Sequence, residues 1–135
     1  MISAPPRPVA SEPGVRAVVE GYLQALKLRD VEMVCSFFAD SARLETPVGQ
    51  WQGKQAIREF YASLFSAFSR YEIQPRAIFV SGDEVSVLWT AQGTLASPPR
   101  GVSFPGSSYF ALTGMQFRQV QVYYDVGDLS RKMIS

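Results

Sequence analysis

The sequence predicts one α+β domain, in which helices from the first half of the chain pack on a curved antiparallel sheet from the second half. The 135 residues fit a single domain with one core, and 47% of them are hydrophobic. Before Arg70 the apolar residues recur at helical spacing, whereas beyond it they alternate with a period of two. Helices first and strands later are typical of the α+β class.

The N-terminal part of the chain divides into an arm and a first helix. Residues 1–14 are rich in proline, alanine and serine and are predicted to form a flexible arm. From residue 15 to about residue 28 the apolar side chains lie on one helical face, which predicts the first helix. Tyr22 lies on its buried side.

Two further helices and a short strand follow. Asp30 can cap a short second helix, whose inner face consists of Val31, Val34, Phe37 and Phe38. A strand is predicted at residues 43–46, after which Pro47 and Gly49 break the chain. The third helix has the strongest pattern, with apolar residues at helical spacing: Ile57, Phe60, Tyr61, Leu64, Phe65 and Phe68.

The second half of the chain is predicted to form antiparallel strands. Alternating segments lie near residues 71–80, 84–94, 103–113 and 117–125. Turn signals separate them at Gly82-Asp83, Pro98-Pro99 and Gly114. The domain is expected to cover residues 15–129, followed by a C-terminal tail at residues 130–135.

Charge and hydropathy exclude several classes of partner. The 13 basic and 12 acidic residues nearly cancel and form no basic stripe, so a nucleic-acid partner is not expected. No apolar run approaches the roughly 18 to 20 residues that span a bilayer, so no membrane partner is expected either. The N-terminus lacks a basic segment followed by an apolar one, which predicts a chain that is not exported.

The residue types that are rare in the sequence restrict its chemistry. The single Cys35 excludes an internal disulfide and favours the cytoplasm. The chain contains no histidine, the usual acid or base at neutral pH and the commonest metal ligand, so a Zn or non-haem iron site is not expected. No cofactor is predicted. Any proton transfer must then use another group, such as a carboxylate whose pKa is raised by burial.

Residues 18–65 contain the motifs GYLQAL, FFADSARLE, PVG and AIREFY. These motifs resemble the N-terminal half of bacterial ketosteroid isomerases. The later stretch GTLASPPRGVSFPG, followed by YF, is similar to the Pro-Pro-x-Gly region of SnoaL-like polyketide cyclases. The resemblance covers about residues 15–129 and implies a cone-shaped domain of the nuclear transport factor-like superfamily. Such a domain encloses an apolar pocket for a small organic molecule.

The resemblance implies three positions in the site. In ketosteroid isomerases a tyrosine and a protonated aspartate form an oxyanion hole, while a second aspartate moves the proton. The tyrosine falls on Tyr22, which is kept. The base falls on Thr46, which cannot act as a base near neutral pH, and the acidic donor falls on Ser108 when SSYF is aligned. The implied pocket therefore has hydroxyls where the isomerases have carboxyl groups.

Strand alternation provides a check that does not depend on the family. It places Thr46 on the apolar face of its strand and Glu45 on the opposite face, so Glu45 is not expected to replace the base. It also places Ser108 inside, on the face that it shares with Phe110.

Asp125, in the segment VQVYYD, is the remaining candidate for a catalytic acid. This segment resembles the strand end of the cyclase and epoxide hydrolase relatives. Alternation places Asp125 opposite the apolar face of Val120, Val122 and Tyr124, although a bulge near Gly114 would reverse the facing. Tyr22 and Asp125 are the predicted catalytic residues. The predicted substrate-binding residues are Thr46, Ser108, Trp89, Phe60, Phe110 and Tyr124.

Several functions remain open at this point. The first is an isomerase or cyclase acting on an apolar carbonyl-bearing steroid, terpenoid or polyketide, with Tyr22 polarising an oxygen and Asp125 or water moving protons. A variant is a cyclisation that needs no strong base. The alternatives are a ligand-binding domain that has lost its carboxylates and a dimerising module that uses the sheet face of Gln119, Gln121 and Tyr123. A homodimer is expected.

Overall fold

The computed structural model describes residues 12–134, and the predicted arm lies outside these residues apart from its last three positions. The first helix, α1, covers Glu12–Leu28 and therefore begins before the predicted residue 15. Val15, Val19, Tyr22 and Leu26 are buried along its inner face, as the helical spacing predicted. The helix ends before Arg29, which has a left-handed backbone with φ of 56°.

The second helix, α2, covers Val31–Ser36 and has the predicted cap, because the Oδ1 atom of Asp30 accepts the amide of Met33 at 3.0 Å. Phe38 was predicted on this helix but begins the first strand. The third helix, α3, covers Lys54–Ala67 and buries Ile57, Tyr61 and Phe65. All three predicted N-terminal helices are therefore present.

The described strands form one six-stranded sheet in the order β2-β1-β6-β5-β4-β3. Their bounds are β1 Phe38–Thr46, β2 Gly49–Gln52, β3 Phe68–Ser81, β4 Glu84–Ala96, β5 Pro99–Thr113 and β6 Gln116–Tyr124. The predicted break at Pro47 and Gly49 is the turn of a hairpin into β2, whose four residues are too few to show a period.

One strand pairing differs from the prediction of an antiparallel sheet. β1 and β6 run parallel, with Leu44 opposite Val120, while the other neighbours in the sheet are antiparallel. Side chains alternate in the same way in parallel and antiparallel strands, so the sequence pattern could not distinguish the two.

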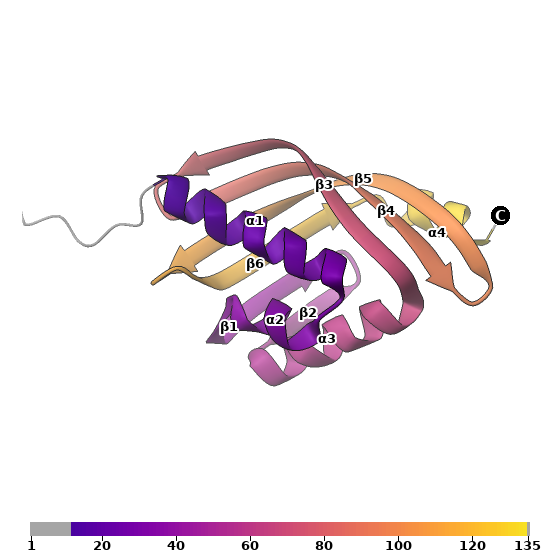
Figure 1. The fold of residues 1–135 in the computed structure, drawn as a ribbon, viewed down its shortest axis with the longest axis horizontal. Coiled ribbons are helices and arrows are strands. Elements are labelled where there is room, and N and C mark those ends of the chain that lie inside the picture. Colours follow the sequence, from indigo (N-terminus) through magenta and orange to yellow (C-terminus); the bar gives the residue numbers. More distant parts are fainter. Residues whose placement is uncertain (1–11, 135) are drawn as a thin grey trace, which may run out of the picture.

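A fourth helix, α4, covers Val126–Ile134 and includes the described residues 130–134 of the predicted C-terminal tail. Val126, Leu129 and Met133 recur at helical spacing, which is a signal that the sequence analysis did not use. Figure 1 shows α1 lying across the concave side of the curved sheet, α3 beside β1 and β2, and α4 near the bend of β5. Within residues 12–134, no helix has both the length and the hydrophobicity needed to cross a bilayer.

The core lies between the helices and the concave face of the sheet. Its largest fully buried side chains include Phe38, Phe110 and Phe117, which surround the ring of Tyr22 edge-on at centroid distances of 6.0, 5.6 and 5.2 Å. This aromatic packing holds the phenol of Tyr22 in one orientation. The same face of the sheet continues into a cavity.

Candidate active site

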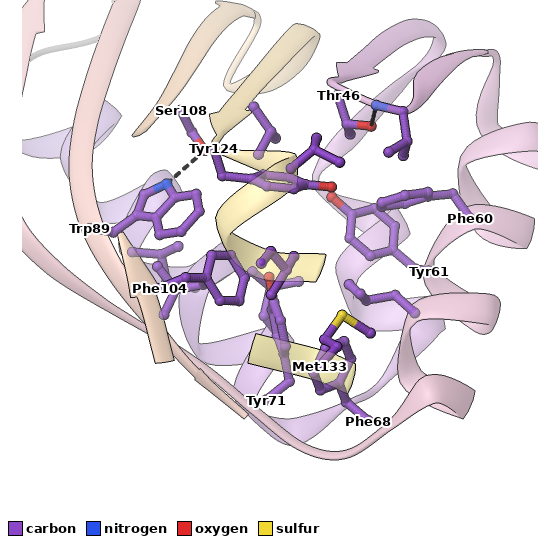
Figure 2. Close-up of a pocket in the computed structure, with 18 of the residues that line it drawn as sticks. Thr46, Phe60, Tyr61, Phe68, Tyr71, Trp89, Phe104, Ser108, Tyr124 and Met133 are labelled. Atoms are coloured by element: carbon purple, nitrogen blue, oxygen red, sulfur yellow. Dashed lines mark hydrogen bonds between the residues drawn. The ribbon is translucent and has the colours of Figure 1, made fainter. Parts of the chain in front are cut away.

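The cavity has a volume of about 310 Å³ and lies between the sheet and the helices α1, α3 and α4 (Figure 2). Its size is at the lower end of the range typical of small-molecule sites. Most of the wall is apolar, with Leu26, Phe60, Phe104 and Leu129 among its members. None of the described lining residues is Asp, Glu, Lys or Arg, so the polar groups of the wall are hydroxyls and one indole N–H.

Tyr22 and Tyr61 form a hydrogen-bonded pair of phenols in the cavity wall. Their oxygen atoms are 2.5 Å apart, and the side chains come from α1 and α3. Burial away from water raises the pKa of both phenols above the ordinary value, so both are neutral at physiological pH. One of the two O–H hydrogens is used within the pair, and the other is left for a ligand.

Tyr71 of β3 and Tyr124 of β6 add two more phenols to the wall. In Figure 2 the hydroxyl of Tyr71 is directed toward the middle of the cavity. Burial, followed by the nearby phenols of Tyr22 and Tyr124, raises the pKa of Tyr71. Burial also raises the pKa of Tyr124. Within the described residues, no hydrogen bond satisfies the hydroxyl of either Tyr71 or Tyr124.

Ser108 of β5 is the buried hydroxyl on another side of the cavity. The indole Nε1 of Trp89, on the neighbouring strand β4, donates to its Oγ atom at 2.9 Å. Ser108 therefore accepts from a side chain rather than from backbone, and its own O–H hydrogen has no acceptor among the described residues. Gly106 makes room for the indole, because a Cβ atom there would lie 2.2 Å from Cη2 of Trp89.

Thr46 lies at the end of β1, across the cavity from Ser108 (Figure 2). Its Oγ1 atom accepts the backbone amide of Val48 at 3.2 Å, so the hydroxyl supports the turn while it lines the cavity. Glu45, its neighbour, points to the other face as predicted and pairs with Arg43 at 2.8 Å. The described lining residues include no carboxylate, so none of them supplies the base that the resemblance would place at Thr46.

The structure brings together most of the site residues that the sequence predicted. Those that line the cavity are Tyr22, Thr46, Phe60, Trp89, Ser108 and Tyr124. Phe110 does not line it, because its side chain packs against Tyr22 and Phe117 in the core behind the cavity. Phe110 lies on the inner face of the sheet, as predicted, but this face extends beyond the cavity into the core.

Asp125 does not line the cavity, so its position does not support its prediction as a catalytic residue. It is exposed, and its Oδ1 atom accepts the amide of Asp128 at 2.9 Å. Asp125 therefore caps the N-terminus of α4, an interaction that a carboxylate makes well. The exposed position of Asp125 agrees with the strand alternation, which places it opposite the apolar face.

Three parts of the wall were missed by the sequence analysis. Tyr61 was assigned only to the helix core, although a buried phenol at that spacing needs a hydrogen-bond partner. Tyr71 alternates with Ile73 on β3, and this spacing could have indicated its inward position. Residues of α4, such as Leu129 and Met133, could not be placed because the helix itself was not predicted.

The arrangement provides hydrogen-bond donors in an apolar enclosure. Neutral phenols can donate to a carbonyl oxygen and to the negative charge that develops on it during a reaction, and Ser108 offers a further donor on another side of the cavity. Within residues 12–134, no three Asp, Glu or Cys side chains lie together in a way that could hold a metal ion.

A helix-covered curved sheet around an apolar cavity defines the ketosteroid isomerase-like fold, as the motifs predicted. Residues 19–120 match the family model of the SnoaL-like domain. The chain therefore belongs to the SnoaL-like family, and the predicted resemblance is confirmed.

Solved structures of other proteins share this fold. One is TerC, co-crystallised with polyporic acid, with a TM-score of 0.81 and 15% identity over 90% of this chain and 99% of that chain. A Shewanella denitrificans protein proposed to be a SnoaL-like polyketide cyclase has a TM-score of 0.82 and 12% identity, covering 90% and 98%. An LEH-like epoxide hydrolase of M. tuberculosis has a TM-score of 0.78 and 19% identity, covering 90% and 86%. At such identities the likeness concerns the fold.

Proposed function

We propose that the protein is an enzyme of the isomerase or cyclase type that acts on an apolar carbonyl-bearing metabolite, without a carboxylate base in its cavity. The observation that carries this proposal is the set of phenols, from Tyr22, Tyr61, Tyr71 and Tyr124, in an apolar wall whose described residues include no charged side chain. Polyketides, terpenoids and steroids are the metabolite classes that suit such a wall.

The proposed chemistry is orientation of the ligand combined with stabilisation of negative charge on its oxygen. The Tyr22 and Tyr61 pair donates to the carbonyl oxygen, and the donation strengthens as the oxygen becomes an enolate in the transition state. A well-aimed donor of this kind contributes about 3 to 4 kcal/mol. Because the raised pKa keeps these phenols protonated, they do not remove protons near pH 7, and a bound water or the substrate itself carries the proton.

The comparisons support the substrate class without defining the substrate. TerC was crystallised with polyporic acid, and the Shewanella denitrificans protein is proposed to be a polyketide cyclase. Both share the fold of this chain. We infer a similar class of small organic ligand for its cavity.

The donor function of the phenols can be tested by restoring the missing base. Androst-5-ene-3,17-dione is a β,γ-unsaturated ketosteroid whose isomerisation needs a base and an oxyanion site. We expect no isomerisation by the wild type and clear activity in Thr46→Asp. Adding Tyr22→Phe should lower that activity by about 100-fold or more, because a donor to the oxyanion is lost. A folded Thr46→Asp variant that binds the steroid but stays inactive would contradict the proposal, as would an unaffected double variant.

The same cavity favours a second candidate function, that of a ligand-binding domain without catalysis. The absence of an acid or base among the described lining residues is the observation in its favour. The pH dependence of turnover separates the two functions. The proposed enzyme should convert its substrate at a rate that is flat across the carboxylate range, whereas a binding domain should release every carbonyl ligand unchanged.

A further inference from the structure

We infer that the cavity selects an uncharged ligand that carries oxygen atoms at two ends, one bound by the phenols and the other by Ser108. The inference rests on the proposed ligand-binding role of the cavity but not on catalysis.

The wall of the cavity predicts that the ligand is uncharged. Its described members contain no cation that could pair with a carboxylate or phosphate, and no anion that could pair with an amine. The nearby cations bind backbone instead: Arg29 donates to the carbonyl of Phe65 at 2.7 Å, and Arg100 to that of Met133 at 3.1 Å. An ionised group in this cavity would lose its water without gaining a partner.

The first end of the site is formed by phenols. The Tyr22 and Tyr61 pair leaves one O–H hydrogen without an acceptor, and the hydroxyl of Tyr71 has no hydrogen bond to any described residue. The Tyr71 hydroxyl is accessible from the cavity, into which it is directed in Figure 2, so it can donate to a ligand oxygen there. We assign Tyr71 to the phenol end of the site on this ground.

The second end is formed by Ser108, with Trp89 as its positioning residue. The Trp89 N–H donates to a lone pair of the serine oxygen, so the serine O–H hydrogen points away from the indole and can be donated to a ligand. A hydroxyl that already accepts a hydrogen bond is also a stronger donor. Figure 2 shows Ser108 and Tyr61 on opposite sides of the cavity, with the ring of Tyr124 between them and that of Phe104 below it. A ligand that satisfies both ends therefore spans the cavity past aromatic rings.

Three steroids with one rigid frame test this inference by titration calorimetry on the full chain. Androst-4-ene-3,17-dione has oxygens at both ends, androst-4-en-3-one has one, and 3-oxoandrost-4-ene-17β-carboxylate has a charged end. We expect the dione to bind roughly three- to tenfold more tightly than the monoketone, the value of one hydrogen bond. The carboxylate should bind at least about 100-fold more weakly than the dione.

Two variants assign the ends. Ser108→Ala should weaken the dione to the level of the monoketone and leave the monoketone unchanged. Tyr71→Phe should weaken both ligands by a similar factor, and because it breaks no hydrogen bond to the described residues we expect it to fold as the wild type does, which circular dichroism checks. Tyr109→Phe is the control, because that phenol lies outside the cavity and donates to Glu84.

The outcomes separate this inference from the proposed function. Equal loss for both ligands in Ser108→Ala, no loss in Tyr71→Phe, or tight binding of the carboxylate would overturn the inference, even if Thr46→Asp isomerises its steroid. The expected binding pattern together with an inactive Thr46→Asp would instead overturn the proposed catalysis. Absence of binding by all three steroids would contradict both.

Discussion

At the scale of single residues, the site contains hydroxyls, and two of them lie at positions where ketosteroid isomerases have carboxyl groups. Resemblance and strand alternation together predicted that Tyr22, Thr46 and Ser108 face the cavity, and the structure places all three in its wall. The partners of Tyr22 and Ser108 could not be predicted, because Tyr61 and Trp89 are far from them in sequence. Hydrogen bonds between distant residues depend on how the elements pack.

Removing the hydroxyl of Ser108 should reduce stability, because the buried N–H of Trp89 would lose its acceptor. For Ser108→Ala we expect the free energy of unfolding to fall by about 1 to 3 kcal/mol, measured by urea denaturation. Ser107→Ala is the matched control and should change it by less than about 0.5 kcal/mol. Equal stability of the two variants would show that the Trp89 hydrogen bond contributes nothing.

The buried phenols should make the fold sensitive to alkaline pH. The pKa of Tyr71 is raised in the folded protein, mainly by burial, whereas in the unfolded chain it ionises near its ordinary value of about 10. Unfolding therefore releases protons above about pH 10, and the stability present below that pH is lost as the pH rises.

Tyr71→Phe removes one such group. Above about pH 10 the unfolding free energy of both proteins should fall as the pH rises. The slope for the variant should be smaller than that for the wild type, and the two slopes should differ by about 1.4 kcal/mol per pH unit. The measurement is urea denaturation at a series of pH values. Parallel curves for the two proteins would contradict the raised pKa.

At the scale of elements, the long, strongly periodic segments were predictable, and so was the short helix α2 from its cap, whereas β2 and α4 were not predicted. α1 and α3 show a helical period over several turns, and β4 alternates along its length, so all three were found. β2 is too short to show a period, whereas α4 has a helical spacing of Val126, Leu129 and Met133 that was not recognised. The missed α4 matters most, because it supplies part of the cavity wall.

Asp125 provides a test of whether its carboxylate serves as a cap or as a catalyst. Asparagine caps helices about as well as aspartate, so Asp125→Asn should keep ligand affinity and turnover. Asp125→Ala should lose about 1 kcal/mol of helix stability and speed amide hydrogen exchange in α4. If Asp125→Asn alone abolished turnover, Asp125 would be catalytic after all.

The close approach of β5 to Trp89 can be tested at two glycines of the same strand. In Gly106→Ala the new methyl group would meet Cη2 of Trp89 and the carbonyl oxygen of Tyr123, the latter at 2.6 Å. We expect a loss of about 1 to 3 kcal/mol in unfolding free energy, and weaker ligand binding as the indole moves. Gly101→Ala meets nothing within 4 Å and should be nearly neutral. Similar thermal denaturation of both variants would show that the indole moves freely.

At the scale of the whole molecule, the fold separates a concave face that forms the cavity from an outer face open to solvent. Leu88 and Tyr123 are 47% and 52% exposed, and both lie opposite Ser107 on the neighbouring strand between them. The homodimer expected from the sequence stays a prediction, as does the cytoplasmic location.

The outer face suggests how a homodimer would be recognised. Sedimentation velocity of the wild type should show a dimer, and Leu88→Asp should shift it toward the monomer because a charge would be buried against the partner copy. Thr90→Asp lies on the same face of β4, and if it also shifts the protein toward the monomer, the dimer contact extends along β4 as far as residue 90. A wild type that sediments as a monomer at high concentration would remove the prediction.

The sequence by itself determined the fold class, the main helices and strands, and the hydroxyl side chains that face inward. Local periodicity and family motifs carry that information, because burial repeats along one helix or strand. The tertiary structure alone decided that β1 and β6 are parallel and that α4 closes the wall of the cavity. It also brought Tyr71 to the phenols of Tyr22 and Tyr61. These features arise from packing between segments distant in sequence, which local patterns do not encode.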